Sequence, residues 1–502
     1  MISVFLCEQR RYTLEQLIQL FYGSNTDVQE ILKLLRYKGL VKTVNKSAEQ
    51  AGLSDLTDDN VVTDDSPNSV FYVFSYVGVI AVKDVILKCY PKYIKKSQTP
   101  VKQLKQVLRV IEKYCSQSQE INLYEDSDGQ TTVNKLAVMI FLLKDYFEYG
   151  LYSNIKDMVE ENGRGEILWD KTINDTYALL NSDVPYYPLL YTRHHVTDEQ
   201  DFFRRLHACV LYKISNEFEL AGLTELFDVA SVPQPDEELE ELGDDDYLIY
   251  RLDRELDVEY NTRKQLLLKA RAAYIANQDI TCCENDSVSL YGTTSFNLVW
   301  ENVCNAVLGD QRSYPMGVLE LPGKLSEKYD ATEMLISVIE KPGWYGLNSD
   351  GTTFCKRAVN TLVPDFLSIC KIGGKYCFII LDAKYYNLQL ESSKLLSGQP
   401  GIESVTKQYL YELAYTDFIR SNHIEVVTNC FLFPSEEDTV QVKGYVELSF
   451  LHSLGLQNIS IRLLPAAVIF EYYLSECKMP IEKLQLDLGA VDYGRIDQGT
   501  TA

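Results

Sequence analysis

The sequence lacks any long hydrophobic run. A helix that crosses a bilayer needs roughly 18 to 20 apolar residues, and the longest candidate here is the short stretch 136–143 inside a mixed helical pattern. The charge order of a secretory signal is also missing, because Glu8, Arg10 and Arg11 follow the first apolar residues instead of preceding them. We therefore expect a soluble cytoplasmic protein without a membrane partner.

Metal-binding cysteine pairs and an excess of positive charge are absent as well. The 12 cysteines are scattered without a CxxC pair, and the 5 histidines are dispersed, so neither a zinc site nor a histidine nuclease motif is predicted. A net charge of -24 excludes a protein that coats nucleic acid with its whole surface, because phosphate neutralisation requires lysine and arginine at the contact. Any DNA contact must therefore be local.

A nucleotide-binding loop is missing too. The segment 317–324 has five residues between its glycines instead of four, and Leu325 stands where a serine or threonine would bind magnesium. The 502 residues exceed one ordinary core, so about two to four domains are expected.

The first 68 residues are expected to form two helices and a strand. Thr13 and Gln16 make the capping box of one helix, a second helix begins at Thr26, and Gly39 ends it. Such a pattern is compatible with a winged-helix-like segment whose second helix enters a DNA groove. It is equally compatible with a small helical cap on the next domain. The polar residues 45–68 then form a loop or wing.

A β-rich region is predicted over residues 69–230. Strand-forming residues fill 70–90, and helical patterns follow over 100–115 and 132–149. Several lysines surround the first junction and form either a phosphate-gripping cluster or an ordinary solvated face. They are Lys88, Lys92, Lys95, Lys96, Lys102 and Lys105.

The clearest boundary is an acidic run. Pro233 and Pro235 precede a series of aspartates and glutamates that ends at Asp246. Mutual repulsion of these carboxylates favours an extended, hydrated linker, which we assign to residues 231–260. The alternative is an acidic docking strip for a basic partner.

The residues that carry chemistry lie in a hairpin predicted over 364–386. Gly373 and Gly374 form a two-residue turn between two strand-like runs. Counting back from this turn along both strands brings Asp365 opposite Asp382. Opposed residues of antiparallel strands point to the same face, with Cβ atoms about 4.5 to 5.5 Å apart. The register therefore predicts two converging carboxylates.

Two facing carboxylates need a cation between them or a raised pKa on one. Lys384 lies two residues beyond Asp382 on the same face, where its ammonium can orient a water or stabilise a pentavalent phosphate. Oxygen ligands favour Mg2+ over zinc, and phosphodiester hydrolysis uses a metal to lower the pKa of water. We therefore predict a Mg2+-dependent phosphodiesterase site. An ordinary hairpin with an exposed Asp-x-Lys is the alternative.

Two predicted helices supply further candidates. The helix 296–308 carries Glu301, which is either a third metal ligand or a solvated helix residue. The helix 405–419 carries Gln408, which can position Lys384 or contact phosphate, together with tyrosines that are expected to pack on the sheet.

Four segments resemble the LlaJI family of restriction endonucleases and, more distantly, the McrC subunit of modification-dependent restriction systems. They are Val79–Lys95 with its Tyr90-Pro91-Lys92-Tyr93, the strand 165–173, Trp300-Glu301, and the hairpin 364–386. The resemblance implies a PD-(D/E)xK nuclease that works with an McrB-like AAA+ GTPase. It further implies that the region before the acidic linker docks on this motor, while the residues after it cut DNA.

The expected fold is α/β (α+β multidomain). Its segments are 1–68 (winged-helix-like), 69–230 (β-rich, McrC-like and partner-binding), 231–260 (acidic linker) and 261–502 (PD-(D/E)xK restriction-endonuclease-like nuclease domain).

The expected function is cleavage of double-stranded DNA in a restriction (phage-defence) system. Asp365, Asp382 and Glu301 would hold Mg2+, with Lys384 and Gln408 assisting catalysis. Two alternatives are a non-catalytic activator that binds the motor or DNA, and a standalone DNA repair or recombination nuclease.

Overall fold

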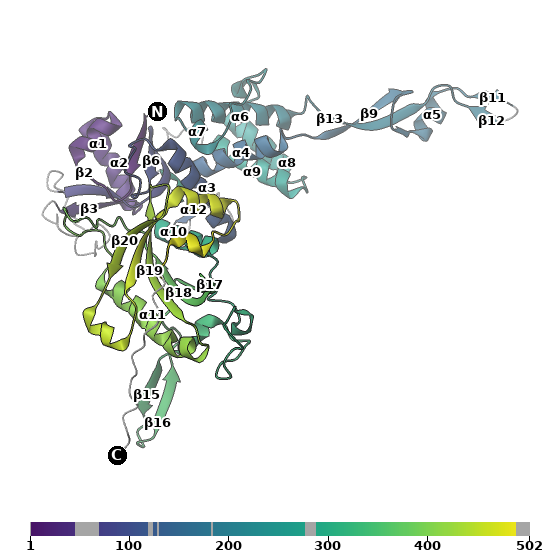
Figure 1. The fold of residues 1–502 in the computed structure, drawn as a ribbon. Coiled ribbons are helices and arrows are strands. Elements are labelled where there is room, and N and C mark those ends of the chain that lie inside the picture. The colour runs from purple at the N-terminus through teal and green to yellow at the C-terminus, as the bar shows by residue number, and fades with distance from the viewer. Residues whose placement is uncertain are drawn as a thin grey trace, which may run out of the picture. The chain divides into compact units, whose positions relative to one another are not determined.

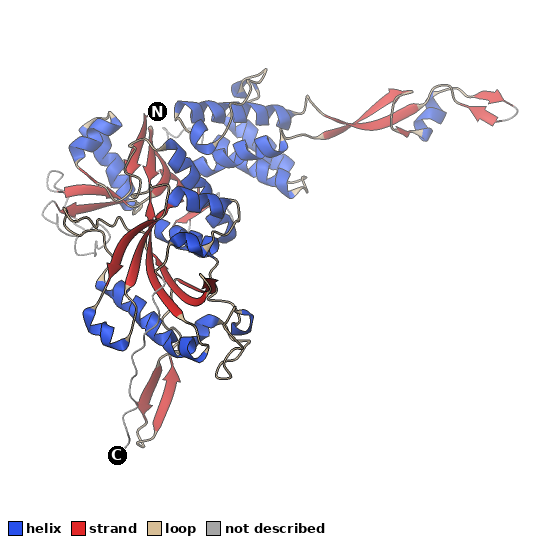
Figure 2. Cartoon of the chain, in the orientation of Figure 1, coloured by secondary structure: helices blue, strands red, loops and turns tan. Residues whose placement is uncertain are grey.

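The fold contains both helices and sheets in two compact units (Figure 2), so the expected α/β multidomain class is confirmed. The smaller unit spans Asn122–Leu290, and the larger unit combines Ile2–Ile121 with Tyr291–Ala502. This computed structural model describes residues 2–45, 70–118, 124–127, 130–181, 184–276 and 288–487.

The larger unit begins with a four-stranded sheet in the order β1-β6-β5-β14. Its strands are β1 (Ile2–Cys7), β5 (Val77–Val82), β6 (Val85–Tyr90) and β14 (Val288–Thr293). Gly78 lies inside β5 with a φ of +142°. A Cβ there would stand 2.3 Å from the carbonyl oxygen of Tyr291, so only glycine permits this close approach.

The N-terminal helices follow the expected order. They are α1 (Leu14–Phe21) and α2 (Asn25–Tyr37), and they accompany a small sheet of β2 (Arg11–Tyr12), β4 (Val70–Phe74) and β3 (Val41–Asn45). The capping box of Thr13 and Gln16 is confirmed. The second helix is capped by Ser24 instead of Thr26, because the Ser24 hydroxyl accepts from the Asp27 amide. The winged-helix assignment stays a prediction, and its expected wing over 46–68 lies outside the described residues.

The C-terminal part of the larger unit is built on a five-stranded sheet in the order β17-β18-β19-β21-β20. The strands are β17 (Phe366–Ile372), β18 (Lys375–Ala383), β19 (Val426–Ser435), β20 (Gln441–Val446) and β21 (Ile459–Pro465). The neighbours β18, β19 and β21 run parallel, whereas β17 and β20 are antiparallel edge strands. Every residue of β19 is buried, as expected for a central parallel strand covered on both faces.

Helices cover both faces of this sheet (Figure 1). On one face, Tyr415 and Phe418 of α11 (Ile402–Ser421) pack against Phe378 of β18. On the other face lie α10 (Phe296–Leu308) and α12 (Ala466–Leu474), which are joined by Trp300 and Phe470. The observed α10 has the bounds expected from the apolar periodicity. These layers hold the end of β18 rigidly.

The two chain segments of the larger unit are packed together. Helix α3 (Val101–Ser118) contacts α10 and α12, and Lys113 donates to the carbonyl oxygens of Tyr473 and Leu474 at the end of α12. The last carbonyls of a helix lack the amide partners of its interior, and the lysine gives these two a further donor. The unit is completed by the exposed hairpin of β15 (Gly343–Leu347) and β16 (Thr353–Arg357) and by short 3-10 turns at Met316–Val318, Leu335–Val338, Ser449–Leu454 and Ile481–Leu484.

The smaller unit is a helical body with a long arm (Figure 1). The body contains α4 (Lys135–Tyr149), α6 (Phe202–Leu220), α7 (Thr224–Phe227), α8 (Asp245–Leu256) and α9 (Thr262–Ala276), preceded by the hairpin β7 (Tyr124–Ser127) and β8 (Gln130–Val133). The arm contains β9 (Ile155–Glu161), β10 (Glu166–Ile167), α5 (Trp169–Asp175), β11 (Leu179–Asn181), β12 (Val184–Tyr186) and β13 (Tyr191–Thr197).

The acidic stretch 231–260 differs from the expected extended linker. It forms a 3-10 turn over Leu239–Glu241 and then α8, whose Leu248 and Leu252 are buried one helical turn apart. Asp244 caps this helix by accepting from the Tyr247 amide, and acids in a first turn favour helix formation through the helix dipole. The acidic run therefore starts a packed helix. The expected division into a partner-binding part before this stretch and a nuclease part after it stays a prediction.

Across the part of the chain that the structure describes, no helix has the length and apolar character needed to cross a membrane.

Candidate active site

The predicted register of the β17–β18 hairpin is confirmed. Ile372 pairs with Lys375 at the turn, and the last pair at the open end is Phe366 with Leu381. Both turn glycines have positive φ angles, 57° for Gly373 and 88° for Gly374, as a two-residue hairpin turn requires. The next residues beyond the ladder are Asp365 and Asp382, so the sequence register places them at the same end of the hairpin.

Lys384 joins these two carboxylates in one cluster. Its Nζ lies 2.8 Å from Oδ1 of Asp382 and 3.9 Å from Oδ2 of Asp365. Asp382 is only 3% exposed, whereas the other two side chains remain partly open to solvent. The three residues singled out in the sequence therefore meet at a half-open site.

The cluster disfavours a negative charge on Asp382 in addition to the charge on Asp365. Burial, followed by the hydrogen bond to Asp365 and its charge, raises the pKa of Asp382 to about 8. For Lys384, burial alone would lower the pKa, but the two carboxylates outweigh it and raise the pKa above its ordinary value. The buried Oδ1 of Asp382 makes no well-directed hydrogen bond, despite its short distance to the lysine. This oxygen already faces one cation, the ammonium of Lys384.

The residues present fit a magnesium ion. Mg2+ is commonly held by one or two carboxylates, with waters and substrate phosphates completing its shell. Asp365 and Asp382 provide two such oxygens, and Asp382 Oδ1 lacks a well-directed protein donor. Within the described ranges, no group of three or more His, Cys, Asp or Glu side chains is arranged to hold a metal. The candidate metal centre thus consists of two acids.

Glu301 lies within electrostatic reach of the cluster. Burial raises its pKa first, the charge of Asp365 adds to this, and Arg312 and Lys384 act in the opposite direction. Its predicted role as a third metal ligand stays a prediction.

Gln408 is fully buried on α11, and neither its side-chain oxygen nor its nitrogen makes a hydrogen bond. The structure therefore shows no hydrogen bond from the Gln408 side chain to Lys384. Contact with phosphate stays a prediction for this residue.

Two residues that the sequence analysis missed hold the backbone before Asp365. Arg312 donates through Nη1 to the carbonyl oxygen of Pro364 at 2.6 Å, and the Tyr411 hydroxyl donates to the carbonyl oxygen of Val363 at 3.0 Å. Burial, followed by the charges of the two aspartates, raises the pKa of Tyr411 to about 12. The sequence gives no sign of this role, because a side-chain bond to a distant backbone carbonyl leaves no local pattern.

Asp310 completes this support. It accepts from Nε of Arg312 at 2.8 Å and from the Leu367 amide at 3.1 Å. The loop after α10 is thereby bonded to the first residues of β17, and the arginine is fixed in its orientation. Hydrogen bonds therefore hold the backbone before Asp365, at Val363 and Pro364, and the backbone after it, at Leu367.

Comparison with known proteins identifies the chain as a restriction endonuclease by class. It belongs to the LlaJI restriction endonuclease family, whose model matches residues 76–471. The family resemblance expected from four sequence segments is therefore confirmed.

A curated relative is the "Type II restriction enzyme BsuMI component YdjA" of Bacillus subtilis (strain 168). It is 26% identical over 481 residues, which cover 94% of this chain and 89% of that protein.

Among solved structures, similarity is found to a half-complex of Thermococcus gammatolerans McrB AAA+ hexamers with bound McrC. The identity is 12%, the match covers 94% of this chain and 99% of that chain, and the TM-score is 0.34. The Thermococcus gammatolerans McrBC complex is 13% identical, with coverages of 60% and 86% and a TM-score of 0.24. These scores are too low to support an inference about function.

Proposed function

We propose that this chain is the Mg2+-dependent DNA endonuclease subunit of a cytoplasmic restriction system, and that Asp365, Asp382 and Lys384 form its PD-(D/E)xK active site. The observation that carries the proposal is their convergence at the open end of one hairpin, where two carboxylates compete for a single cation. Membership of a restriction endonuclease family supports the same reaction class.

Each residue of the cluster has a distinct task in this proposal. A magnesium ion held by Asp365 and Asp382 would lower the pKa of a water and offset charge on the scissile phosphate. Lys384, held 2.8 Å from Asp382, keeps a positive charge beside the reacting phosphate. Glu301, which interacts electrostatically with Asp365 and Lys384, is the candidate third carboxylate of the site. Arg312 and Tyr411 keep the backbone of Asp365 in place.

The exposed β15–β16 hairpin is a suitable DNA-contacting element. Trp344 and Tyr345 are 71% and 81% exposed, and Phe354 is also exposed. Trp344 pairs with Lys356 across the two strands. A hairpin of two strands is marginally stable in water by itself, and the major groove accommodates a two-stranded ribbon. Its aromatic rings and cations suit bases and phosphates.

The hairpin is also tied to the active site through the chain. Its base is closed by the bond from the Ala358 amide to the Pro342 carbonyl oxygen, and Asp365 follows Ala358 by seven residues. Seven extended residues span at most about 24 Å, which is less than the roughly 34 Å of one DNA turn. DNA in the active site therefore lies within reach of the hairpin.

The arm of the smaller unit is the proposed docking element for an McrB-like AAA+ GTPase. The arm of this chain presents many large apolar side chains to solvent, which a protein partner would cover. They are Ile155, Met158, Val159, Trp169, Ile173, Tyr177, Leu179, Leu180, Val184 and Tyr186. A surface of this kind, on an arm built on the three-stranded sheet β10-β13-β9, is typical of a protein interaction site.

A cleavage assay tests the proposal and separates its rivals. Double-stranded DNA is incubated with Mg2+, nucleotide, the partner GTPase and either the parent chain or Asp382→Asn. We expect the variant to lose DNA cleavage and to keep its stimulation of GTP hydrolysis. Unchanged restriction by the variant would support a non-catalytic activator, and efficient cleavage by the parent chain alone would support a standalone repair nuclease. Lys371→Ala, near the closed end of the same hairpin, is the matched control.

A further inference from the structure

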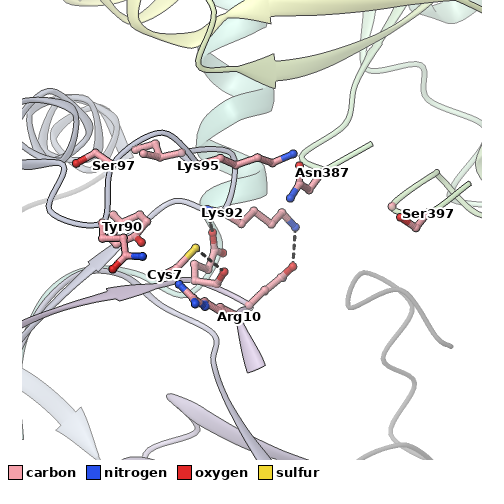
Figure 3. Close-up of a pocket in the computed structure, with 13 residues that line it drawn as sticks. Cys7, Arg10, Tyr90, Lys92, Lys95, Ser97, Asn387 and Ser397 are labelled. Atoms are coloured by element: carbon pink, nitrogen blue, oxygen red, sulfur yellow. Dashed lines mark hydrogen bonds between the residues drawn. The ribbon is translucent and has the colours of Figure 1, made fainter. Parts of the chain in front are cut away.

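A cavity in the larger unit lies beyond the end of β18, the strand that carries Asp382. Its volume is about 460 Å3, and it is lined by the end of β1, the segment after β6 and the loop after β18 (Figure 3). From the last of these come Asn387 and Ser397. Asn387 follows Lys384 by three residues, a span of at most about 10 Å in extended chain. The cavity is therefore a near neighbour of the proposed active site.

Three cations and one carboxylate line this cavity: Arg10, Lys92, Lys95 and Glu8. The carboxylate of Glu8 is already engaged, because it accepts from the Tyr385 hydroxyl and from the Lys92 backbone amide. Burial also raises the pKa of Glu8, which weakens its negative charge further. In a chain with a net charge of -24, this cavity is a local positive site.

Carboxylates lie within electrostatic reach of the cavity lysines, Glu8 for Lys92, and Glu391 and Glu436 for Lys95. Lys92 donates to the side-chain oxygen of Gln9 at 2.7 Å and lies 4.5 Å from the centre of the Tyr385 ring. Among the residues that the structure describes, neither Lys92, Lys95 nor Arg10 forms an ion pair with a carboxylate. The amino ends of Lys92 and Lys95 extend toward the side of the cavity that carries Asn387 (Figure 3). Burial lowers the pKa of Lys92 by more than the charge of Glu8 raises it, so the buried ammonium is incompletely compensated and a bound anion would stabilise it.

We propose that this cavity binds a phosphate group of the DNA strand that occupies the active site. The inference rests on the proposed DNA substrate. The cavity residue Asn387 is at most about 10 Å of extended chain from Lys384, so a strand bound at the active site has its neighbouring phosphates within reach of the cavity. Amide and hydroxyl side chains of Gln9, Ser97 and Asn387 provide further donors for phosphate oxygens.

The cavity is connected to the active site through Tyr385, which directly follows Lys384. Its ring packs against Phe296 of α10 at 5.1 Å between centroids, and its hydroxyl is bonded to Glu8 of the segment after β1. The phosphate site and the catalytic lysine are thus held at a fixed spacing by one short segment. A strand engaged at both points would have its scissile bond held beside Asp365, Asp382 and Lys384.

The test measures DNA binding without cleavage, in the full-length Asp382→Asn chain with a dye-labelled duplex over a series of salt concentrations. Replacing Lys95 by Gln should weaken binding several-fold and reduce the slope of log K against log salt by about 0.9, the loss of one phosphate contact. Arg10→Gln should behave alike. The control is Lys96→Gln, because Lys96 is paired with Glu437 and does not line this cavity.

Each outcome decides between sources of the phosphate. Unchanged slopes for both Lys95→Gln and Arg10→Gln would overturn the proposal while the parent's DNA binding stands. A different result would assign the cavity to a free ligand and overturn the DNA assignment. In that case inorganic phosphate or a mononucleotide would protect the parent from thermal unfolding, and the variants would lose this protection without a change in salt slope. A parent chain that binds no DNA would instead count against the proposed function itself.

Discussion

Replacing Asp382 by Asn is expected to stabilise the metal-free protein while it abolishes cleavage. Burial and then Asp365 raise the pKa of Asp382 from 3.8 to about 8. Between these values the folded protein holds a proton that the unfolded chain has released, so the free energy of unfolding falls as the pH rises through this window. At about 1.36 kcal/mol per pKa unit, the cost at pH 7 is at most about 4 kcal/mol. Asparagine has no proton to hold and avoids this cost.

Thermal unfolding in the presence of a chelator, from about pH 5 to about pH 9, measures this effect. The Tm of the variant should exceed that of the parent near neutral pH and above. The difference should shrink as the pH falls toward 4, because the Asp382 carboxyl then becomes protonated in the unfolded chain as well as in the folded protein. Added Mg2+ should raise the Tm of the parent but not of the variant, because ion binding to the folded state alone stabilises it. Asp438→Asn, an exposed acid, serves as the control. A variant whose Tm is below that of the parent at every pH would refute the reasoning.

Three further predictions address the support of the site, the DNA contact and the partner contact. Arg312→Met should lower kcat by about 100-fold through displacement of Asp365, with little change in DNA affinity; an equal loss of affinity in a binding assay would contradict this. Trp344→Ala together with Phe354→Ala should weaken DNA binding in an anisotropy assay and leave the Mg2+-dependent Tm shift intact. Leu180→Asp, at the arm tip, should abolish stimulation of the partner GTPase without changing the Tm of the isolated chain, whereas retained stimulation would place the contact elsewhere.

The part of the site that the sequence predicts is the part determined by local rules. A two-glycine turn and the alternation of strand residues set the register of Asp365 and Asp382, and the spacing of Lys384 follows from the same alternation. Helix α10 was also predicted, because its apolar residues recur at helical spacing. The roles of Arg312 and Tyr411 were missed, because their acceptors are backbone carbonyls 52 and 48 residues away in the chain. Contacts of that kind depend on the assembled fold.

The acidic stretch shows a different limit. Charge repulsion was expected to extend residues 231–260, but the chain there alternates acids with leucines that find a helical core. Partner cations also reduce the repulsion, since Glu237 bonds Arg205 at 2.8 Å and Glu240 lies 3.4 Å from Lys213. The charge composition of residues 231–260 therefore overestimated their tendency to form an extended linker. Leu248 and Leu252 are buried only in the assembled fold, which composition does not reveal.

The two-part construction of the larger unit leads to a last prediction, about which fragment can act as a nuclease. A fragment limited to residues 261–502, the nuclease domain expected from the sequence, loses helix α3 and with it the cap that Lys113 provides for α12. It also loses the hydrogen bond between Tyr385 and Glu8. The two hydrogen bonds that the backbone amides of Lys95 and Lys96 donate to Glu436 are lost as well.

Such a fragment should therefore unfold more readily and bind Mg2+ poorly. Residues 2–121 joined to 291–502 by a flexible Gly/Ser linker should instead keep a cooperative thermal transition and a Mg2+-dependent Tm shift, while losing all response to the partner GTPase because the arm is gone. Circular dichroism melts of both fragments, with and without Mg2+, measure the difference. If the 261–502 fragment melted as cooperatively as the joined one and gained the same stability from Mg2+, the N-terminal segment would not be part of the nuclease core. The packing of α3 against α10 and α12 argues that it is, because removing a helix from a buried interface exposes apolar surface that the remaining chain cannot cover.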